Sequence, residues 1–528
     1  MPPQIAVFTA NLSYSVRKGI VAIDRAIPDV KWLVLVHAPP RTPRLLLRNQ
    51  WRNLKRNGLR WIPYQIGEIA GRLATPGSAT DAAGTPGLGY TRAAIDAMPN
   101  LRICEFADIH GDDALAVLRD FAPDLGIALA SPILRATLFT IPRLGTLNLH
   151  KGKVPDYRGM PPAFWELWND EREVGCTIHW VDAKLDTGAI AARATVPREK
   201  FATPTSLQLR LDEVGVDLMR EVVRSVLAGA HPATPQAPGG RTFRKPTLAQ
   251  AAALSRRLEA LQPTPTTGGL RQGAKRGLYR GAFMMQRLGA LRARAPRITV
   301  LLYHRVSDEA RDNLTVGVAQ FDRQMALLRR HCRVLSLDEV LAADDVPHSA
   351  VPLVCVTFDD GYLDNYLYAA PILARHGVPA AFFVSTRIVA SERRFPHDVR
   401  RENPPIPVLN WDQLRAMRAE GFTIGSHAAT HIDCAAEPED VVVRELAQSR
   451  DDLARELGVA APIFAYPYGG RQHMTPSRLA LVKAAGYTAC LAAYGGSNVN
   501  RVDRWNVLRR GIHWEFSDEA FLYECLGN

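Results

Sequence analysis

Short apolar runs alternate with amphipathic stretches along the first half of the chain. Asp112–Phe121 has a helical pattern, and Leu207–Leu227 is a longer amphipathic segment of the same kind. The apolar runs among such segments are Ile5–Thr9, Trp32–His37, Leu101–Phe106 and Asp124–Ala130. Strand and helix patterns in alternation are typical of βαβ units. We therefore expect an α/β domain with a mostly parallel sheet over residues 1–250.

A second series of strand and helix patterns begins near residue 297. Its candidate strands are Ile298–Tyr303, Leu353–Phe358, Ala380–Val384, Thr423–Ile424 and Ile463–Tyr466. The helical patterns that separate these runs again favour βα units. This series predicts a second α/β domain over residues 297–528.

The segment between the two series, residues 251–296, is predicted to be a basic linker. Gln262–Gly269 is rich in Pro, Thr and Gly, as flexible linkers are. Arg271–Arg294 then combines many basic residues with interspersed Leu, Phe and Met. This basic stretch has two interpretations, an amphipathic helix in contact with a membrane surface or a docking helix with a solvated basic face.

Length and charge limit the classes of partner. A chain of 528 residues is long enough for two large domains and a linker. Its formal net charge of +12 favours either simple solubility or a partner with negative charge, such as an anionic lipid or a phosphate-bearing substrate. No nucleic-acid-binding motif is visible, so we expect no nucleic-acid partner.

Cysteine usage and hydropathy indicate the compartment. The seven cysteines are scattered and never form a Cys-x-x-Cys pair, which argues against a disulfide framework and against a cysteine zinc site. The first residues have no basic segment followed by a long apolar one, so they do not predict a signal peptide. No window reaches the roughly 18 apolar residues of a membrane span. We expect a cytoplasmic protein, with contact to a membrane surface as an open alternative.

The densest chemical signal of the first half lies between residues 145 and 190. Asn148 and His150 are two apart at the end of an apolar strand, so alternation places both side chains on one face. Asp186 follows a second strand in a Leu-Asp-Thr-Gly turn. An amide that stabilises an oxyanion, an imidazole that moves protons and a carboxylate that tunes it suit acyl transfer to an amine. Each group alone is more often structural than catalytic.

The motifs around these residues resemble those of the formyltetrahydrofolate-dependent formyltransferases, which act on methionyl-tRNA, glycinamide ribonucleotide or sugar amines. The matching motifs are Asn148-x-His150, Val154-Pro155-x-Tyr157-Arg158-Gly159, Gly175-Cys176-Thr177-Ile178-His179 and Leu185-Asp186-Thr187-Gly188. The resemblance implies a Rossmann-like domain that uses N10-formyltetrahydrofolate, with Asn148, His150 and Asp186 as the catalytic residues. It also implies contacts to the folate from Pro132, Ile133, Leu134, Asp182, Leu185 and Thr187.

Two differences from the family bear on the acceptor. Lys151–Pro155 replaces the Pro-Ser-Leu-Leu-Pro run usual in the family, which leaves the three catalytic residues in place but changes the acceptor side. Residues after 250 do not resemble the second folding unit of the tRNA-directed members, so we expect a sugar amine as acceptor. Phe164 and Trp165 have two interpretations, as lining of the acceptor site or as core.

The second half carries a different set of chemical groups. Asp359 and Asp360 end a buried strand, where unpaired carboxylates would be costly. His427 and His431 are four apart, so one helical turn would place both imidazoles on the same side. Two histidines and one aspartate form a common catalytic metal set that leaves positions open for water and substrate.

These residues resemble the motifs of the polysaccharide deacetylase (NodB-homology) family. The matching motifs are Thr357-Phe358-Asp359-Asp360-Gly361, Ser426-His427-x-x-x-His431 and Tyr466-Pro467-Tyr468-Gly469. The resemblance implies a distorted βα-barrel in which Asp360, His427 and His431 bind a divalent metal, with Zn²⁺ as the expected ion. It further implies Asp359 as general base, Tyr468 as oxyanion donor, His513 as general acid, and Asp503 and Trp505 as pocket wall. Ala465 stands where many members have an arginine that orients the base, and Arg471 and Arg510 are the candidate replacements.

The two halves together predict a bifunctional enzyme of amino-sugar modification. A deacetylase exposes an amine and a formyltransferase consumes one, so a fused pair would convert an N-acetyl group to N-formyl on a nucleotide-linked or lipid-linked sugar. One alternative is formylation followed by deformylation. Another is that one domain is inactive and serves as a binding or docking module.

Overall fold

The computed structural model describes residues 2–40, 42–58, 61–62, 65, 95–263, 281, 295–343, 345–401, 405–460 and 462–527. The described residues form two compact units, one up to residue 262 and one from residue 263 onward. The basic stretch 271–294, with its predicted membrane contact, lies outside the described residues apart from residue 281.

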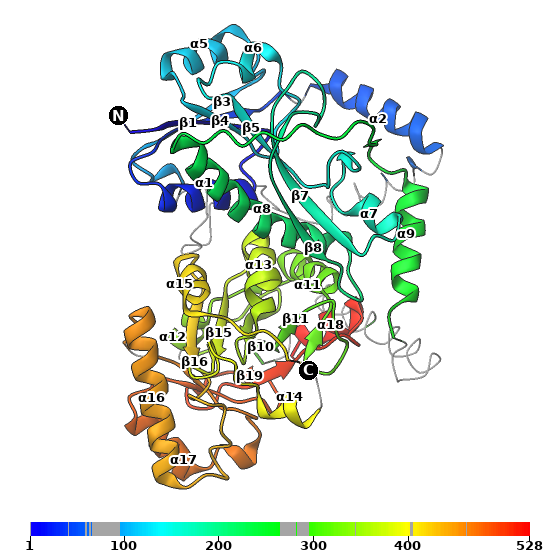
Figure 1. Ribbon diagram of the computed structural model, residues 1–528. Coiled ribbons are helices and arrows are strands. Elements are labelled where there is room, and N and C mark those ends of the chain that lie inside the picture. The colour runs from blue at the N-terminus through cyan, green and yellow to red at the C-terminus, as the bar shows by residue number, and fades with distance from the viewer. Residues whose placement is uncertain are drawn as a thin grey trace. The chain divides into compact units, whose positions relative to one another are not determined.

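The N-terminal unit is built on a seven-stranded sheet with the strand order β3-β2-β1-β4-β5-β7-β8 (Figure 1). Its strands are β1 (Gln4–Thr9), β2 (Lys31–His37), β3 (Leu101–Phe106), β4 (Leu125–Ala128), β5 (Thr146–His150), β7 (Glu173–Trp180) and β8 (Ile190–Pro197). The first five strands are parallel, whereas β7 and β8 are antiparallel. The order 3-2-1-4-5 is that of a Rossmann-like sheet.

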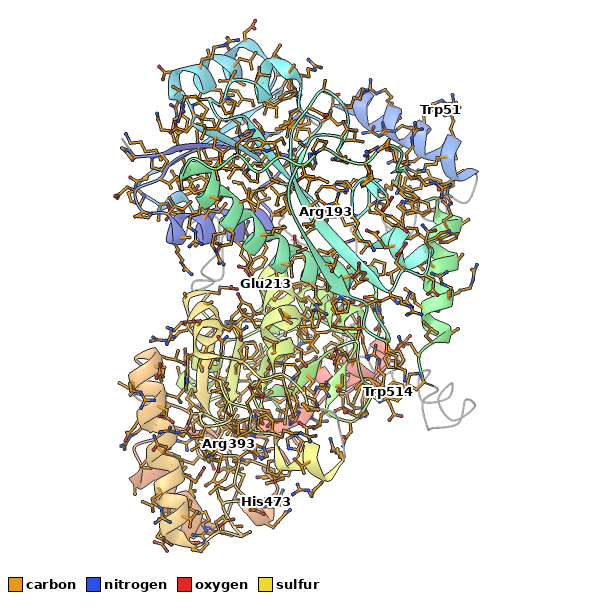
Figure 2. The ribbon with its side chains drawn as sticks, viewed as in Figure 1. Trp51, Arg193, Glu213, Arg393, His473 and Trp514 are labelled. Atoms are coloured by element: carbon orange, nitrogen blue, oxygen red, sulfur yellow. The ribbon has the colours of Figure 1, made fainter. Side chains whose placement is uncertain are left out.

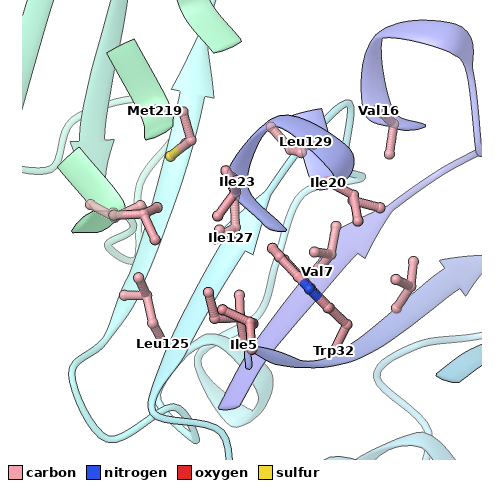
Figure 3. Packing of buried hydrophobic residues seen from close by; sticks show 14 of the residues in the cluster. Ile5, Val7, Val16, Ile20, Ile23, Trp32, Leu125, Ile127, Leu129 and Met219 are labelled. Atoms are coloured by element: carbon pink, nitrogen blue, oxygen red, sulfur yellow. The ribbon is translucent and has the colours of Figure 1, made fainter. Parts of the chain in front are cut away.

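Helices cover both faces of this sheet, which explains why its parallel strands are almost continuously apolar. On one face, α1 (Tyr14–Ala26) and α8 (Pro204–Leu227) pack against Ile5, Val7 and Trp32 of the sheet (Figure 3). On the other face lie α5 (Asp112–Phe121) and α6 (Ala136–Phe139). The unit also contains α2 (Pro43–Asn57), β6 (Arg158–Gly159), α7 (Phe164–Trp168), β9 (Thr242–Phe243) and α9 (Leu248–Ala260).

The C-terminal unit has a second, mainly parallel sheet. Its main strands are β10 (Arg297–Tyr303), β14 (Leu353–Phe358), β15 (Ala380–Val384), β16 (Thr423–Ser426), β17 (Phe464–Ala465), β18 (Cys490–Leu491) and β20 (Arg509–Gly511). A parallel bridge joins Leu491 to Val507, and β20 pairs in parallel with β10. The sheet therefore curls back on its first strand as a distorted barrel.

Short strands and helices complete the C-terminal unit. The helices that surround the sheet are α11 (Val318–His331), α12 (Leu337–Ala342), α13 (Ala370–His376), α14 (Pro396–Arg400), α15 (Trp411–Ala419), α16 (Glu439–Leu457), α17 (Pro476–Ala484) and α18 (Asp518–Cys525). The short strands are β11 (Arg305–Val306), β12 (Thr315–Val316), β13 (Arg333–Val334) and β19 (Asn498–Val499). Single turns lie at Asn365–Ala369, a π-helix, and Arg471–His473, a 3-10 helix.

The predicted fold class is confirmed in both units. Leu101–Phe106, Leu353–Phe358 and Ala380–Val384 are strands with the predicted bounds. The first predicted helix, Asp112–Phe121, also has the predicted bounds. Among the helices that the structure describes, none is both long enough and apolar enough to cross a bilayer.

Candidate active sites

In the N-terminal unit, the carboxyl end of β5 brings Asn148 and His150 to one face of the sheet. The Asn148 Nδ2 atom lies 3.0 Å from Nε2 of His179 on the neighbouring strand β7 and 3.5 Å from Oδ1 of Asp186. Because His179 Nδ1 donates to the Trp180 carbonyl, its Nε2 accepts from Asn148. Among the described residues, the second Asn148 proton has only the 3.5 Å contact with Asp186, so it is the one available to an incoming oxyanion.

Asp186 reaches this group from the loop after β7, with a left-handed backbone (φ 55°). Its Oδ2 atom accepts the Gly159 N–H at 3.0 Å and lies 3.4 Å from Nδ1 of His150. Burial raises the pKa of Asp186, but its contacts with His179, His150 and the Gly159 N–H outweigh that effect. The pKa therefore lies below its usual value, and Asp186 is ionised at neutral pH.

His150 lies between two acceptors and is 7 % exposed. Its Nε2 atom donates to the Tyr157 carbonyl at 2.7 Å, and Nδ1 faces Asp186. Burial lowers the pKa of His150, although the Asp186 carboxylate and the Tyr157 carbonyl act in the opposite direction. The resting ring is thus neutral with its proton on Nε2, and Nδ1 has a lone pair to accept a proton next to a carboxylate that stabilises the product.

A pocket of about 430 Å³ opens beside these groups. Five of the six predicted folate contacts line it together with Asn148, His150 and Asp186, namely Pro132, Ile133, Leu134, Asp182 and Leu185. The sixth, Thr187, donates its hydroxyl to Asp182 at 2.8 Å and so fixes that lining residue. Phe164 and Trp165 do not line this pocket, because they pack in the core formed with α8 and α9.

In the C-terminal unit, the strand β14 ends at Asp359 and Asp360. Asp360 has a left-handed backbone (φ 75°), and its carboxylate is buried. Neither of its oxygens has a hydrogen-bond partner among the described residues. Oδ1 lies 3.2 Å from Nε2 of His431 and 3.5 Å from Nε2 of His427. A buried carboxylate without hydrogen bonds, facing imidazole nitrogens, fits a cation.

The predicted helical turn that carries His427 and His431 is wrong. Both residues lie in an irregular loop after β16, where Ala428 (φ 62°) and His431 (φ 59°) have left-handed backbones. These two left-handed residues bend the loop so that the imidazole rings lie 4.9 Å apart. The rings thus still face one site, although not through helical spacing.

The imidazole of His427 is prepared as a ligand by its surroundings. Its Nδ1 atom donates to the Ala465 carbonyl at 2.8 Å, which leaves the Nε2 lone pair facing Asp360. Burial lowers the pKa of His427 to about 4, so the ring is neutral at physiological pH, as metal binding requires.

A third histidine, which the sequence analysis did not identify, also faces Asp360. His397 places Nε2 3.5 Å from Asp360 Oδ2 and 2.8 Å from the Tyr362 hydroxyl. That hydroxyl donates to Asp398 at 2.7 Å, so His397 Nε2 must donate to it and carries the proton. Asp360, His397 and His431 could together hold a metal ion. Because His397 Nε2 carries the proton donated to Tyr362, it has no lone pair for a metal, which favours Asp360 Oδ1, His427 and His431 as the ligands.

The Asp359 carboxylate is held by Arg509, which lies fully buried on β20. The guanidinium donates from Nη1 and Nη2 to the two oxygens of Asp359, each at 2.7 Å. Burial raises the pKa of Asp359, but the charge of Arg509 and its hydrogen bonds lower it by more. Asp359 is therefore an ionised acceptor with a fixed orientation.

The predicted replacements for the missing arginine at Ala465 are wrong. Arg471 lies 4.6 Å from the ring of Tyr494, and Arg510 pairs with Glu524 at 2.7 Å. Arg510 is the next residue after Arg509 on an extended strand, so its side chain points to the opposite side of the sheet.

Of the remaining predicted residues, Tyr468 contacts a histidine of this centre, whereas Trp505 and Asp503 have other contacts. Tyr468 (φ 62°) packs its ring 5.0 Å from His431, and its N–H donates to no described residue. Trp505 packs in a hydrophobic cluster with Tyr466, and the exposed Asp503 accepts the Trp505 N–H. No contact of a described residue joins Asp503 or Trp505 to Asp360.

His513 and His304 differ in whether they act on Asp359 and Asp360. His513 contacts Phe516 and Glu515, and burial lowers its pKa. His304, directly after β10, lies close enough for its charge to lower the pKa of both Asp359 and Asp360.

Comparison with known proteins separates the two units. The formyl transferase family model matches residues 93–223, and the polysaccharide deacetylase family model matches residues 348–490. The methionyl-tRNA formyltransferase of Roseiflexus castenholzii is 37% identical over 133 residues, which cover 25% of this chain and 42% of that protein. The corresponding protein of Halorhodospira halophila is 34% identical over 166 residues, 29% of this chain and 53% of that protein. The chain thus spans about half the length of these relatives, or less.

The matches among solved structures include proteins of both kinds. The Streptococcus pyogenes deacetylase PplD in complex with acetate is 24% identical, covers 43% of this chain and 98% of its own, and has a TM-score of 0.37. A sugar N-formyltransferase from Shewanella sp FDAARGOS_354 is 15% identical, covers 48% of this chain and 87% of its own, and has a TM-score of 0.31. One polypeptide therefore resembles two families of enzymes, the formyl transferases in its N-terminal half and the polysaccharide deacetylases in its C-terminal half.

Proposed function

We propose that the chain is a bifunctional enzyme that removes an N-acyl group from an amino sugar and transfers a formyl group to the resulting amine. The observation that carries the proposal is the presence of two chemically complementary sites in one chain. One is a pocket with an amide, a neutral imidazole and an ionised carboxylate, and the other is a buried carboxylate without hydrogen bonds that faces imidazoles.

The N-terminal pocket supports formyl transfer from N10-formyltetrahydrofolate. Its volume of about 430 Å³ is within the usual range for a small-molecule site, and Ile133, Leu134 and Leu185 offer apolar walls. As the amine attacks the formyl carbon, His150 Nδ1 accepts the proton that the amine loses, and Asp186 stabilises the imidazolium. Asn148 Nδ2 donates to the formyl oxygen, where negative charge develops. The bond from the formyl carbon to N10 then breaks, and N10 takes up a proton.

The C-terminal centre supports amide hydrolysis. A divalent ion, with Zn²⁺ as the proposed species, would be held by Asp360, His427 and His431 and would supply Lewis acidity to the amide carbonyl and to water. Asp359, fixed by Arg509, accepts the proton of the attacking water. The Tyr468 N–H, which has no acceptor among the described residues, is placed to donate to the carbonyl oxygen. The leaving nitrogen gains a proton, so one water yields an amine and a carboxylate.

We assign the acid that protonates the leaving nitrogen to His304 in preference to the predicted His513. The Asp359 N–H donates to the Tyr303 carbonyl at 3.0 Å, so the next residue, His304, lies beside the aspartates, whereas the described contacts of His513 are with Phe516 and Glu515. A His304→Gln variant should lose at least about a hundredfold in hydrolysis rate, and His513→Gln should lose less. If His513→Gln loses more of the hydrolysis rate than His304→Gln does, the acid is His513.

The substrate class follows from the coupling of the two reactions. Fusion raises the local concentration of the amine intermediate, and the net charge of +12 suits a sugar that carries phosphate on a nucleotide or lipid. Mass spectrometry of nucleotide-linked N-acetylamino sugars, incubated with the full chain, Zn²⁺ and formyltetrahydrofolate, tests this. A product lighter by one methylene supports sequential exchange of acetyl for formyl.

Each of the other outcomes would show which of the two proposed reactions is wrong. Free amine without formylation would support the proposed hydrolase. It would also show that the site at Asn148 does not formylate that sugar. Formylation of an added amino sugar followed by release of formate would replace the proposed order with formylation and deformylation. Turnover at only one site, with any acceptor, would show that the other unit is a binding module.

A further inference from the structure

Among the side chains of α2 that the structure describes, two large apolar ones point outward and three asparagines are half-buried. Asn49, Asn53 and Asn57 are spaced by four residues and form its half-buried stripe, together with Leu54. On the outward side, Leu47 is 70 % exposed and Trp51, one turn later, is 60 % exposed (Figure 2). A surface helix normally turns its apolar stripe inward, so the outward pair indicates contact with something else.

The asparagine stripe anchors the helix in this orientation. Asn57 Oδ1 accepts the N–H of Leu248, the first residue of α9, at 2.9 Å. Its Nδ2 donates to the Asn53 carbonyl at 3.0 Å, and Asn49 accepts from Arg52. The contact with Leu248 joins the end of α2 to α9, whereas the other two contacts lie within α2 itself.

Positive charge surrounds the outward apolar pair. Four basic side chains on the helix are exposed, namely Arg48, Arg52, Lys55 and Arg56. The Lys55 ammonium lies 5.4 Å from the centre of the Trp51 ring. The sequence from Pro43 to Asn57 contains no acidic residue. No acidic residue of the helix competes for its basic side chains, so these side chains are available to attract an anionic surface.

We propose that α2 docks the protein on an anionic lipid surface, with Leu47 and Trp51 inserted at the level of the headgroups. Trp is the side chain that favours the boundary between headgroup and hydrocarbon, and basic residues next to it pair with anionic lipids. A helix with a narrow apolar stripe and basic flanks lies in the interface rather than across it. None of the described α2 residues lines the pocket of the N-terminal unit.

The test uses the full chain and vesicles of defined composition. Sedimentation with phosphatidylcholine vesicles, with and without about one third phosphatidylglycerol, should give binding only when the anionic lipid is present. Binding should fall as the salt concentration rises to about 0.5 M, because screening shortens the reach of the basic side chains. The double substitution Leu47→Glu with Trp51→Glu should weaken vesicle binding by about tenfold or more.

Two further variants separate docking from misfolding. Arg48→Glu with Arg52→Glu should weaken binding to the anionic vesicles to a similar extent while leaving the apolar pair in place. Val443→Glu, at a 45 % exposed apolar position on α16, is the matched control and should bind as the unmodified chain does. All three should keep the melting temperature and the formyl-transfer rate.

Three results would overturn the proposal. They are unchanged vesicle binding by both α2 variants, equal binding to neutral and anionic vesicles, and binding of an RNA oligonucleotide in place of vesicles. Unchanged binding by both α2 variants would mean that another part of the chain, such as the basic stretch 271–294, contacts the vesicles.

Discussion

The pair of Arg509 and Asp359 makes the strongest test of how the C-terminal centre is built. Replacing Arg509 with Met removes a fully buried cation and leaves the Asp359 carboxylate, itself 2 % exposed, without its two hydrogen bonds. Breaking a buried ion pair by removing one partner costs about 3–5 kcal/mol, because the other charge stays buried and unpaired. We expect the free energy of unfolding of the C-terminal unit to fall by that amount.

The expected shift in melting temperature follows from the size of the unit. For a unit of roughly 230 residues, about 2–4 °C per kcal/mol gives a decrease of roughly 6–20 °C, measured by calorimetry on the full chain. The hydrolysis rate should fall by about two to four orders of magnitude, because the proton acceptor loses its charge and orientation. Arg510→Met, next to it on β20, removes only a partly exposed pair with Glu524 and should shift the melting temperature far less.

The pH dependence adds a second criterion. In the native chain the pKa of Asp359 is lowered, so its contribution to stability is present at neutral pH and is lost as the pH falls through the folded pKa. In Arg509→Met the pKa of Asp359 should instead be raised, so the variant recovers stability as the pH falls and the carboxylate takes up a proton. The difference between the two proteins should therefore be largest at neutral pH.

A double variant isolates the unpaired charge as the cause. Asp359→Asn combined with Arg509→Met removes the buried charge, so it should be more stable than Arg509→Met alone and equally inactive. The reasoning is refuted if the single variant melts within about 2 °C of the native chain, or if the double variant is no more stable than the single one.

Four further predictions concern metal, protons and stability. Removal of divalent ions with a chelator should abolish amide hydrolysis and spare formyl transfer, and His431→Ala should do the same in the presence of metal. His397→Phe should keep the site but weaken metal affinity by about 10- to 100-fold in a chelator competition, because the polar imidazole next to Asp360 Oδ2 and its hydrogen bond to Tyr362 are lost. Asp186→Asn should lower formyl transfer by about two to four orders of magnitude without affecting hydrolysis. Burial raises the pKa of Glu166 to about 7, so stability is lost as the pH rises from about 4.5 through 7, and Glu166→Gln should recover at most about 3 kcal/mol at pH 8 and nothing at pH 4.

The sequence predicted the strands best where they are buried on both faces. Leu353–Phe358 is an almost continuous apolar run because the strand is buried on both faces, and its bounds were therefore visible. The common orientation of Asn148 and His150 could also be predicted from the sequence, because alternation along a strand places both side chains on one face. The spacing of His427 and His431 was visible as well, but its helical interpretation was wrong, because left-handed residues in the loop bring the rings together.

Arg509 and His397 could not be found in the same way. Arg509 reaches Asp359 because β20 pairs with β10, and that pairing joins residues about 200 positions apart in the sequence. Nothing in the local pattern around Arg509 separates it from Arg510, and their alternation on the strand decides which one faces inward. His397 lies in a short segment without periodicity, so only the folded chain shows that it faces Asp360.

The left-handed backbones at Asp186, Asp360, His431 and Tyr468 have a consequence for engineering. At each of these four positions a residue other than glycine occupies a conformation that costs about 1–2 kcal/mol relative to its preferred ones. Glycine would relieve that cost, so a library screened only for heat resistance should enrich glycine at the positions that the proposed chemistry needs. Selection for thermostability would then drive the protein toward robust but inactive variants, unless these positions are held constant.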